Sequence, residues 1–315
     1  MPRRKTPPPT LAEAVNFPRD PVSGRLIDPS TGKFFRRTNA MMDEFRDIIL
    51  DVIRAEPKLT LRRLHYALVS RGVQPNVLTS YQNLSAISVE MRRGGSIPRG
   101  TFVDNARETL YPNIWDSLAE AVASLIDHYR RSPWTNSEDR VLVMVEKDAL
   151  RGVLWPTCSS LGVPLGIARG RASESFLEDM AEVINDEASE YAGNLHVGYL
   201  GDWDPTGWAN PDDIEKRLRG FLDDESRMTF TRLGLNPAQI TALGLPTSMV
   251  AKSSDPNYAR WPGGTVAVEV DAVPVAELQR IVRDFIGTFI TQAEYDAAED
   301  AAAEDVEKLE AFAAT

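Results

Sequence analysis

Residues 195–207 read Leu-His-Val-Gly-Tyr-Leu-Gly-Asp-Trp-Asp-Pro-Thr-Gly. The first six of these residues form an apolar run that is typical of a buried strand. Pro205 and Gly207 then favour a turn before the next helix. Asp202 and Asp204 therefore fall at the carboxyl end of the predicted strand, where open α/β sheets bind their ligands. A polar turn that only caps the helix would explain the same pair of acids.

A second predicted strand also ends in an acid. Residues 141–145 read Val-Leu-Val-Met-Val and are followed by Glu146. If the two strands are neighbours, Glu146 converges with Asp202 and Asp204 at one edge of the sheet. Carboxylates so close together repel each other unless a cation lies between them. Their hard oxygen atoms suit Mg²⁺ or Mn²⁺, so the three acids are predicted to form a metal site.

Strands and helices alternate through the second half of the chain, which predicts an α/β fold with a parallel sheet and helices on both faces. The predicted strands are 141–147, 164–169, 194–202 and 228–234, and the main helices between them are 173–188 and 210–223. Pro156 is expected to kink or end the helix after the first strand. Residues 266–273 alternate in polarity and predict a further strand, with Glu269 and Asp271 on one face.

Residues 39–110 are predicted to form a winged-helix (CAP-like) DNA-binding domain. Apolar spacing predicts a helix from Asn39 to Pro57, a second after the N-cap Thr60, and a third over residues 79–93. A glycine-rich ribbon follows at 94–103, and the third helix would enter the major groove. A solvated wing would explain the arginines of this region as well as phosphate contacts do. The arginines predicted to contact DNA are Arg92, Arg93, Arg99 and Arg107.

Tyr66 lies in the second of these helices. At about 100° per residue, the leucines of residues 61–69 form one stripe, and Tyr66 falls roughly opposite, beside Arg62 and Arg63. A tyrosine that serves packing should lie on the leucine stripe. Tyr66 is therefore a candidate nucleophile whose pKa the neighbouring arginines would lower. An ordinary surface tyrosine is the alternative.

Several segments resemble one family of DNA-cleaving enzymes. Val-Glu-Lys-Asp-Ala at 145–149, Arg-Gly at 169–170 and Gly-Asp-Trp-Asp-Pro-Thr-Gly at 201–207 resemble the Toprim domain of the topoisomerase VI A subunit. That family includes the meiotic double-strand-break transesterase. Thr-Leu-Arg-Arg-Leu-His-Tyr at 60–66 resembles its catalytic-tyrosine segment, with His65 where relatives often carry Tyr or Phe. The C-terminal layout is more similar to compact Toprim proteins of phages and mobile elements.

The resemblance implies a Toprim domain over residues 141–290 that cleaves double-stranded DNA with Mg²⁺ or Mn²⁺. Tyr66 would attack a backbone phosphate. In the family, the tyrosine of one subunit works with the metal site of the other, which implies a homodimer. The other residues predicted to take part in catalysis are Arg62, Arg63, Glu146 and Lys147.

Two basic residues near the predicted acids have open roles. Lys147 either binds a phosphate or pairs with Asp148. Arg169, at the end of the second strand, either presents a DNA-binding group or only precedes a glycine that the turn needs.

The charge of the chain is unevenly distributed. Its net charge is −11, but residues 1–110 carry 18 Lys and Arg against 11 Asp and Glu, and the remainder carries 17 against 35. This asymmetry fits a basic DNA-binding half joined to an acidic half that holds cations, although an acidic tail without function would fit it too. Cys158 is the single cysteine, so neither an intramolecular disulfide nor a cysteine-based zinc site is possible.

The flanking segments are predicted from composition. Residues 1–38 are expected to be a flexible basic arm with a short hairpin near residues 25–27, residues 111–140 a helix and linker, and residues 291–315 an acidic helical tail. A signal peptide and a run of membrane-spanning length are both lacking, which predicts a cytoplasmic, nucleoid-associated protein. The sequence has no P-loop motif, so strand passage would need a separate ATPase subunit.

The function expected from the sequence is Mg²⁺-dependent DNA cleavage by tyrosine transesterification. One alternative is a hydrolytic Toprim nuclease in which a metal-bound water attacks and Tyr66 is incidental. The other is a non-catalytic DNA-binding protein on the same scaffold.

Overall fold

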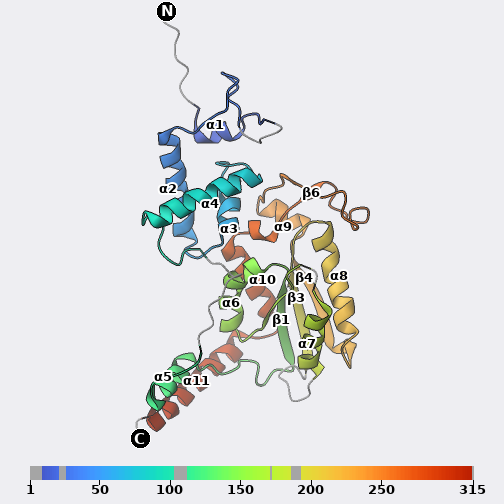
Figure 1. Cartoon of the computed structure of the whole chain (residues 1–315). Helices are drawn as coiled ribbons and strands as arrows, with labels where there is room; N and C mark the ends of the chain where they lie inside the picture. Colours follow the sequence, from blue (N-terminus) through green and yellow to red (C-terminus); the bar gives the residue numbers. More distant parts are fainter. Residues whose placement is uncertain (1–8, 21–25, 103–111, 171, 186–192, 314–315) are drawn as a thin grey trace, which may run out of the picture.

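The computed structural model describes residues 9–20, 26–102, 112–170, 172–185 and 193–313. An α/β unit forms the middle of the molecule, a group of helices lies at its N-terminal side, and two helices extend from it at the opposite end (Figure 1).

The α/β unit contains a four-stranded parallel sheet in the order β2-β1-β3-β4, which confirms the predicted α/β class with a parallel sheet. The strands are β1 (Asp139–Val145), β2 (Leu165–Ile167), β3 (Asn194–Leu200) and β4 (Met228–Gly234). Helices cover both faces of this sheet, and they are α6 (Arg151–Ser160), α7 (Glu174–Asn185), α8 (Pro205–Arg219) and α10 (Val275–Ile286).

Alternate side chains of β1 enter two different cores, as the pleat of a strand requires. Val143 packs with α6 and α10 on one face, whereas Met144 packs with α7 and α8 on the other. In the register between β1 and β3, Val145 faces Leu200. Strands β1 and β3 end at this level, so the residues that follow them are neighbours.

Several predicted boundaries differ from those of the structure. The helix after β1 does not end at Pro156 but continues to Ser160, because its buried face packs against α10. It is preceded by the 3₁₀ turn η1 (Asp148–Leu150). The helix expected at 210–223 begins at Pro205, with Asp204 as its N-cap. Proline is well placed there, since a first-turn N–H has no partner within the helix.

The strand predicted at 266–273 is wrong for most of its length. β6 (Val266–Ala267) pairs antiparallel with β5 (Met249–Val250), and Val268 then bridges to Trp203. The chain next forms the 3₁₀ turn η3 (Val270–Ala272), whose residues are buried. Glu269 and Asp271 therefore lie on a buried turn rather than on one face of a strand.

The N-terminal helices agree with the prediction. They are α2 (Asn39–Ala55), α3 (Leu61–Ser70) and α4 (Leu78–Arg93), and Thr60 caps α3 by accepting a hydrogen bond from the amide of Arg63. After α4, the described ribbon makes one bridge, between Leu59 and Phe102. Residues 103–111 lie outside the described chain, so the predicted wing stays a prediction.

The described part of the predicted flexible arm is folded onto these helices. It contains α1 (Leu11–Val15), and Leu11 and Ala14 are buried in the same core as α2 and α3. Bridges between Arg19 and Leu26 and between Ile27 and Phe34 follow it. The arm differs from the expectation because Leu11 and Ala14 bury apolar surface on one side of a short helix, which the Pro-rich composition does not indicate.

The two helices that extend from the body are α5 (Leu118–His128) and α11 (Gln292–Ala313), and they pack against each other (Figure 1). The hydroxyl of Tyr129 donates to Asp305, and Arg131 pairs with the same carboxylate.

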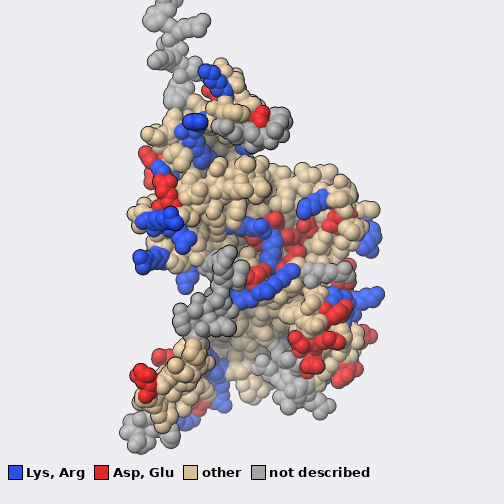
Figure 2. Space-filling view, viewed as in Figure 1, with Lys and Arg blue, Asp and Glu red and all other residues tan. Residues whose placement is uncertain are grey.

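The remaining short elements are η2 (Glu225–Arg227) and α9 (Pro237–Ala242). On the face shown in Figure 2, acidic side chains gather around α7 and α8. None of the helices in the described residues has the length and apolar character needed to cross a membrane.

Candidate active site at the carboxyl ends of the strands

Glu146 follows β1 and is buried. Its Oε2 atom accepts a hydrogen bond from the amide of Asp202 at 2.9 Å, and the amide group of Asn210 lies 3.4 Å from Oε1. Burial raises the pKa of Glu146, and the negative charge of Asp204 adds to this effect. A Cβ at Gly201 would lie 2.7 Å from Oε2 of Glu146, so this position needs glycine.

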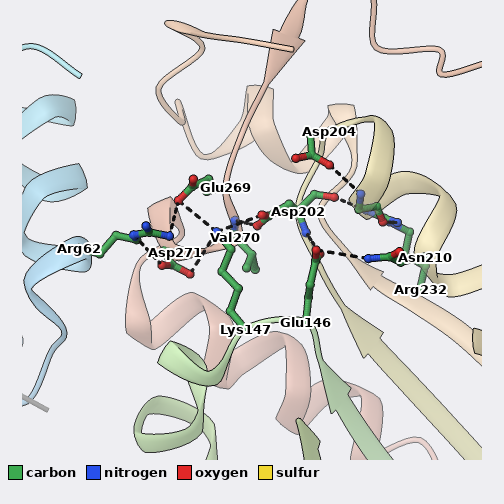
Figure 3. Close-up of polar contacts among 11 residues, drawn as sticks. Arg62, Glu146, Lys147, Asp202, Asp204, Asn210, Arg232, Glu269, Val270 and Asp271 are labelled. Carbon is green, nitrogen blue, oxygen red and sulfur yellow. Dashed lines mark hydrogen bonds and ion pairs between the residues drawn. The ribbon is translucent and has the colours of Figure 1, made fainter. Parts of the chain in front are cut away.

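Asp202 follows β3 and lies next to Glu146, as the sequence predicted. Its Oδ1 atom accepts a hydrogen bond from the amide of Val270 at 2.8 Å, and its Oδ2 atom lies 3.0 Å from Nζ of Lys147. Burial raises the pKa of Asp202 to about 7, because it outweighs the opposing effect of the Lys147 charge. Asp204 instead points to the first turn of α8, where it accepts a hydrogen bond from the amide of Gly207 (Figure 3).

Lys147 lies among three carboxylates. Besides Asp202, its ammonium nitrogen is 3.0 Å from Oε2 of Glu269 and 3.8 Å from Oδ1 of Asp271. Burial alone would lower the pKa of Lys147, but these three charges raise it. The alternative in which Lys147 pairs with Asp148 is wrong, since the carboxylate of Asp148 pairs with Arg151 and Arg169.

Glu269 and Asp271 come from the buried turn around η3, and they were not among the site residues predicted from the sequence. Neither carboxylate oxygen of Asp271 receives a hydrogen bond from a described residue, and burial raises its pKa. Arg62 on α3 reaches both acids, at 3.2 Å from Glu269 and 3.8 Å from Asp271 (Figure 3). The sequence signal that could have indicated their role is the occurrence of two acids, one residue apart, within the apolar run of residues 266–273.

Tyr66 also belongs to this cluster. It is 5% exposed and packs in the core of the α/β unit, whereas Leu64 and Leu68 of the same helix pack in the N-terminal core. The predicted opposition of Tyr66 to the leucines is therefore confirmed. The alternative of a surface tyrosine is wrong, because the face opposite the leucines is covered by the turn around η3.

The expected activation of Tyr66 by arginines is also wrong. Burial and, after it, the charge of Glu269 raise the pKa of Tyr66 despite the nearby Arg62. Arg63 is engaged elsewhere, since its Nε atom donates to Glu56 at 2.9 Å and its NH1 atom donates to the carbonyl oxygen of Ala272.

The remaining predicted DNA contacts lie outside this cluster or outside the described chain. Arg92 and Arg93 are exposed in the last turn of α4, and Arg99 is exposed in the following loop. Arg107 lies outside the described residues. Arg169 is 66% exposed at its side chain and has a positive φ of 51°. Their contacts with phosphate stay predictions.

The predicted metal ligands fit a divalent cation in their chemistry but not in their present arrangement. Glu146 and Asp202 are adjacent, offer hard oxygen donors, and have raised pKa values because burial disfavours their charged forms. Within the described residues, however, no three His, Cys, Asp or Glu side chains are grouped as metal ligands. The carboxylate of Asp204 is turned to its own helix, and Lys147 supplies a positive charge beside Asp202.

Comparison with models of known protein families and with curated protein sequences finds no match to this chain.

Proposed function

We propose that this protein cleaves double-stranded DNA by transesterification, with Tyr66 as the nucleophile and Glu269 as the base that accepts its proton. The observation that carries the proposal is the packing of α3, which carries Tyr66, against the turn that carries Glu269, whose charge helps to raise the pKa of Tyr66. A nucleophile with a base beside it is a usual signature of covalent catalysis. Both residues adjoin the acids at the carboxyl ends of β1 and β3, where an α/β sheet places its chemistry.

In the proposed step, the phenolic oxygen of Tyr66 bonds to the phosphorus as the bond to the leaving strand breaks. The phenolic proton passes to Glu269, and the leaving oxygen takes a proton from water. Lys147 and Arg62, which pair with Glu269, are placed to stabilise negative charge on the phosphate. A raised phenol pKa is compatible with this scheme, because the base removes the proton during attack rather than before it.

A divalent cation is part of the proposal. Glu146, Asp202 and Asp204 would hold Mg²⁺ or Mn²⁺, which would supply Lewis-acid stabilisation of a phosphoryl oxygen. The side chain of Asp204 would have to leave the cap of α8 for all three acids to act together.

Access to Tyr66 requires α3 to separate from the turn around η3, since the tyrosine is buried between them. The pair Arg62–Glu269 and the hydrogen bond from Arg63 to Ala272 hold these elements together. In a homodimer, Tyr66 of one copy would meet Glu269 of the other. The winged-helix and Toprim assignments, the homodimer and an ATPase partner for strand passage are all parts of this proposal.

Hydrolysis by a metal-bound water is the second candidate, and the burial of Tyr66 favours it. In that case Glu269 is only a polar neighbour of a buried hydroxyl. A non-catalytic DNA-binding protein is the third candidate, and it is favoured by Lys147, which balances the acids without a metal.

The deciding experiment is cleavage of end-labelled duplex DNA with Mg²⁺ or Mn²⁺, analysed on denaturing gels with and without proteinase. Wild-type protein should leave strands that enter the gel only after digestion, and Tyr66→Phe should bind DNA without cleaving it. Tyr129→Phe is a matched control, because Tyr129 is another tyrosine with an acidic neighbour: its hydroxyl donates to Asp305 on the distant α5–α11 pair. Free ends made equally by wild type and Tyr66→Phe would establish hydrolysis, and no cleavage by any protein would favour the third candidate.

A further inference from the structure

A groove with basic residues along it lies between the N-terminal arm and α4, away from the acid cluster. Its volume is about 450 Å³, within the range of small-molecule sites. Arg19, Arg36 and Arg37 line it, and among the described residues no Asp or Glu does. This lining belongs to residues 1–110, which carry 18 Lys and Arg against 11 Asp and Glu. On the face shown in Figure 2, basic side chains are visible between the arm and α4.

The charge of Arg37 is held in place without a carboxylate. Its guanidinium donates to the carbonyl oxygen of Val73 at 3.3 Å and lies 4.1 Å from the ring centroid of Phe45. Within the described part of the chain no ion pair involves Arg37, and burial lowers its pKa. A partly desolvated arginine that faces a cavity attracts an anion, most strongly one that can accept two parallel hydrogen bonds.

The first turn of α4 forms another part of the wall. Thr79 and Ser80 line the groove with hydroxyl groups, and no side chain caps this end of the helix. The amide of Ser80 donates to the carbonyl oxygen of Val77 at 3.0 Å, and the positive end of the helix dipole at this turn favours a phosphate. The dipole acts here together with the arginines rather than alone.

The floor of the groove is apolar and one of its edges carries an amide. Phe35, Met42 and Ile87 are half-buried and supply its apolar surface, whereas Phe45 and Leu84 are fully buried. Aromatic and aliphatic surfaces of this kind pack against a planar base, and the exposed amide of Asn83 can both donate to and accept from a base edge. Inorganic phosphate alone would leave this apolar surface uncovered.

We propose that this groove binds a nucleoside phosphate, with its phosphate at Arg36, Arg37 and the first turn of α4 and its base on the apolar floor. The same chemistry is offered by a free nucleotide and by the phosphorylated end of a nucleic-acid strand. The inference does not depend on the proposed cleavage chemistry, since neither Tyr66 nor the acids take part in it.

The test is isothermal titration calorimetry of the full chain with AMP, adenosine, inorganic phosphate and a 5′-phosphorylated single-stranded oligonucleotide. AMP should bind at least about tenfold more tightly than adenosine or phosphate, since each of these lacks one half of the recognised groups. Arg36→Gln and Asn83→Ala should each weaken AMP binding, by about tenfold for the charged contact. Both side chains are exposed, so the variants should fold, and a thermal melt checks this.

Arg130→Gln is the matched control, because Arg130 is an exposed arginine beyond α5, and it should bind AMP like the wild type. If the oligonucleotide binds more tightly than AMP and Arg36→Gln weakens both to the same degree, the ligand is the phosphorylated end of a strand. Equal affinities would identify a free nucleotide. Absence of binding to both ligands, or binding that Arg36→Gln and Asn83→Ala leave unchanged, would overturn the proposal.

Discussion

The ammonium nitrogen of Lys147 lies 3.0 Å from Oδ2 of Asp202, at the carboxyl edge of the parallel sheet. The sequence predicts a metal ion among the acids at this edge, whereas in the structure Lys147 lies beside Asp202. Glu269 and Asp271 approach the same ammonium group from a distant turn. The chain thus carries its own counter-ion, and a bound metal would have to act beside it or displace it.

Replacing Lys147 by Met should destabilise the protein by about 3–5 kcal/mol, because it leaves buried carboxylates without their shared counter-ion. Adding Asp202→Asn should recover part of the loss, since one of those carboxylates becomes neutral. Chemical denaturation of the single and double variants without divalent metal measures this coupling. If the double variant loses as much free energy of unfolding as the two single variants together, the two residues are not coupled.

Stability should fall as the pH rises through the range of the Asp202 titration. Its pKa is about 7 in the folded protein, against about 3.9 for an unfolded aspartate. Between these values the folded state binds more protons than the unfolded state, so the stabilisation present below pH 4 is lost by about pH 7.

The free energy of unfolding of the wild type should therefore decrease relative to that of Asp202→Asn by up to about 1.4 kcal/mol per pH unit in this window. The raised pKa of Glu146 acts in the same direction and persists in the variant. Urea denaturation from pH 4 to 8 with a chelator present measures the difference. Parallel curves for the two proteins would contradict the assigned pKa.

Local pattern predicted much of this fold because the signals lie within single elements. Strand β4 occupies the predicted residues, and Thr60 caps its helix through the adjacent backbone. The site depends instead on contacts across the chain, since Arg62 and Glu269 are separated by 207 positions. No periodicity near Tyr66 reveals that a distant acidic turn covers it, so its burial and raised pKa were not predictable.

Gly201→Ala should destabilise the protein by about 1–3 kcal/mol, because the added Cβ would lie 2.6 Å from the Tyr199 ring and 2.7 Å from Glu146. Gly94→Ala is the matched control. Gly94 has a helical conformation, and a Cβ there would lie 3.4 Å from its nearest neighbour, so alanine should be neutral or stabilising by up to about 1 kcal/mol. Thermal unfolding of both variants measures these changes in stability. Equal melting temperatures for Gly201→Ala and Gly94→Ala would show that the turn after β3 relaxes freely.

Mg²⁺ should raise the melting temperature of the wild type if Glu146, Asp202 and Asp204 hold it. Ligand at about 100 times its dissociation constant stabilises a protein by about 2.7 kcal/mol. The increase should shrink in Asp202→Asn and Asp204→Asn, which each remove a proposed ligand. Asp148→Asn is the matched control, because this nearby acid is paired with Arg151 and Arg169 instead of facing the cluster. Differential scanning calorimetry over a series of Mg²⁺ concentrations measures the shifts. Shifts of equal size in all four proteins would place the cation elsewhere and leave Lys147 as the counter-ion of the cluster.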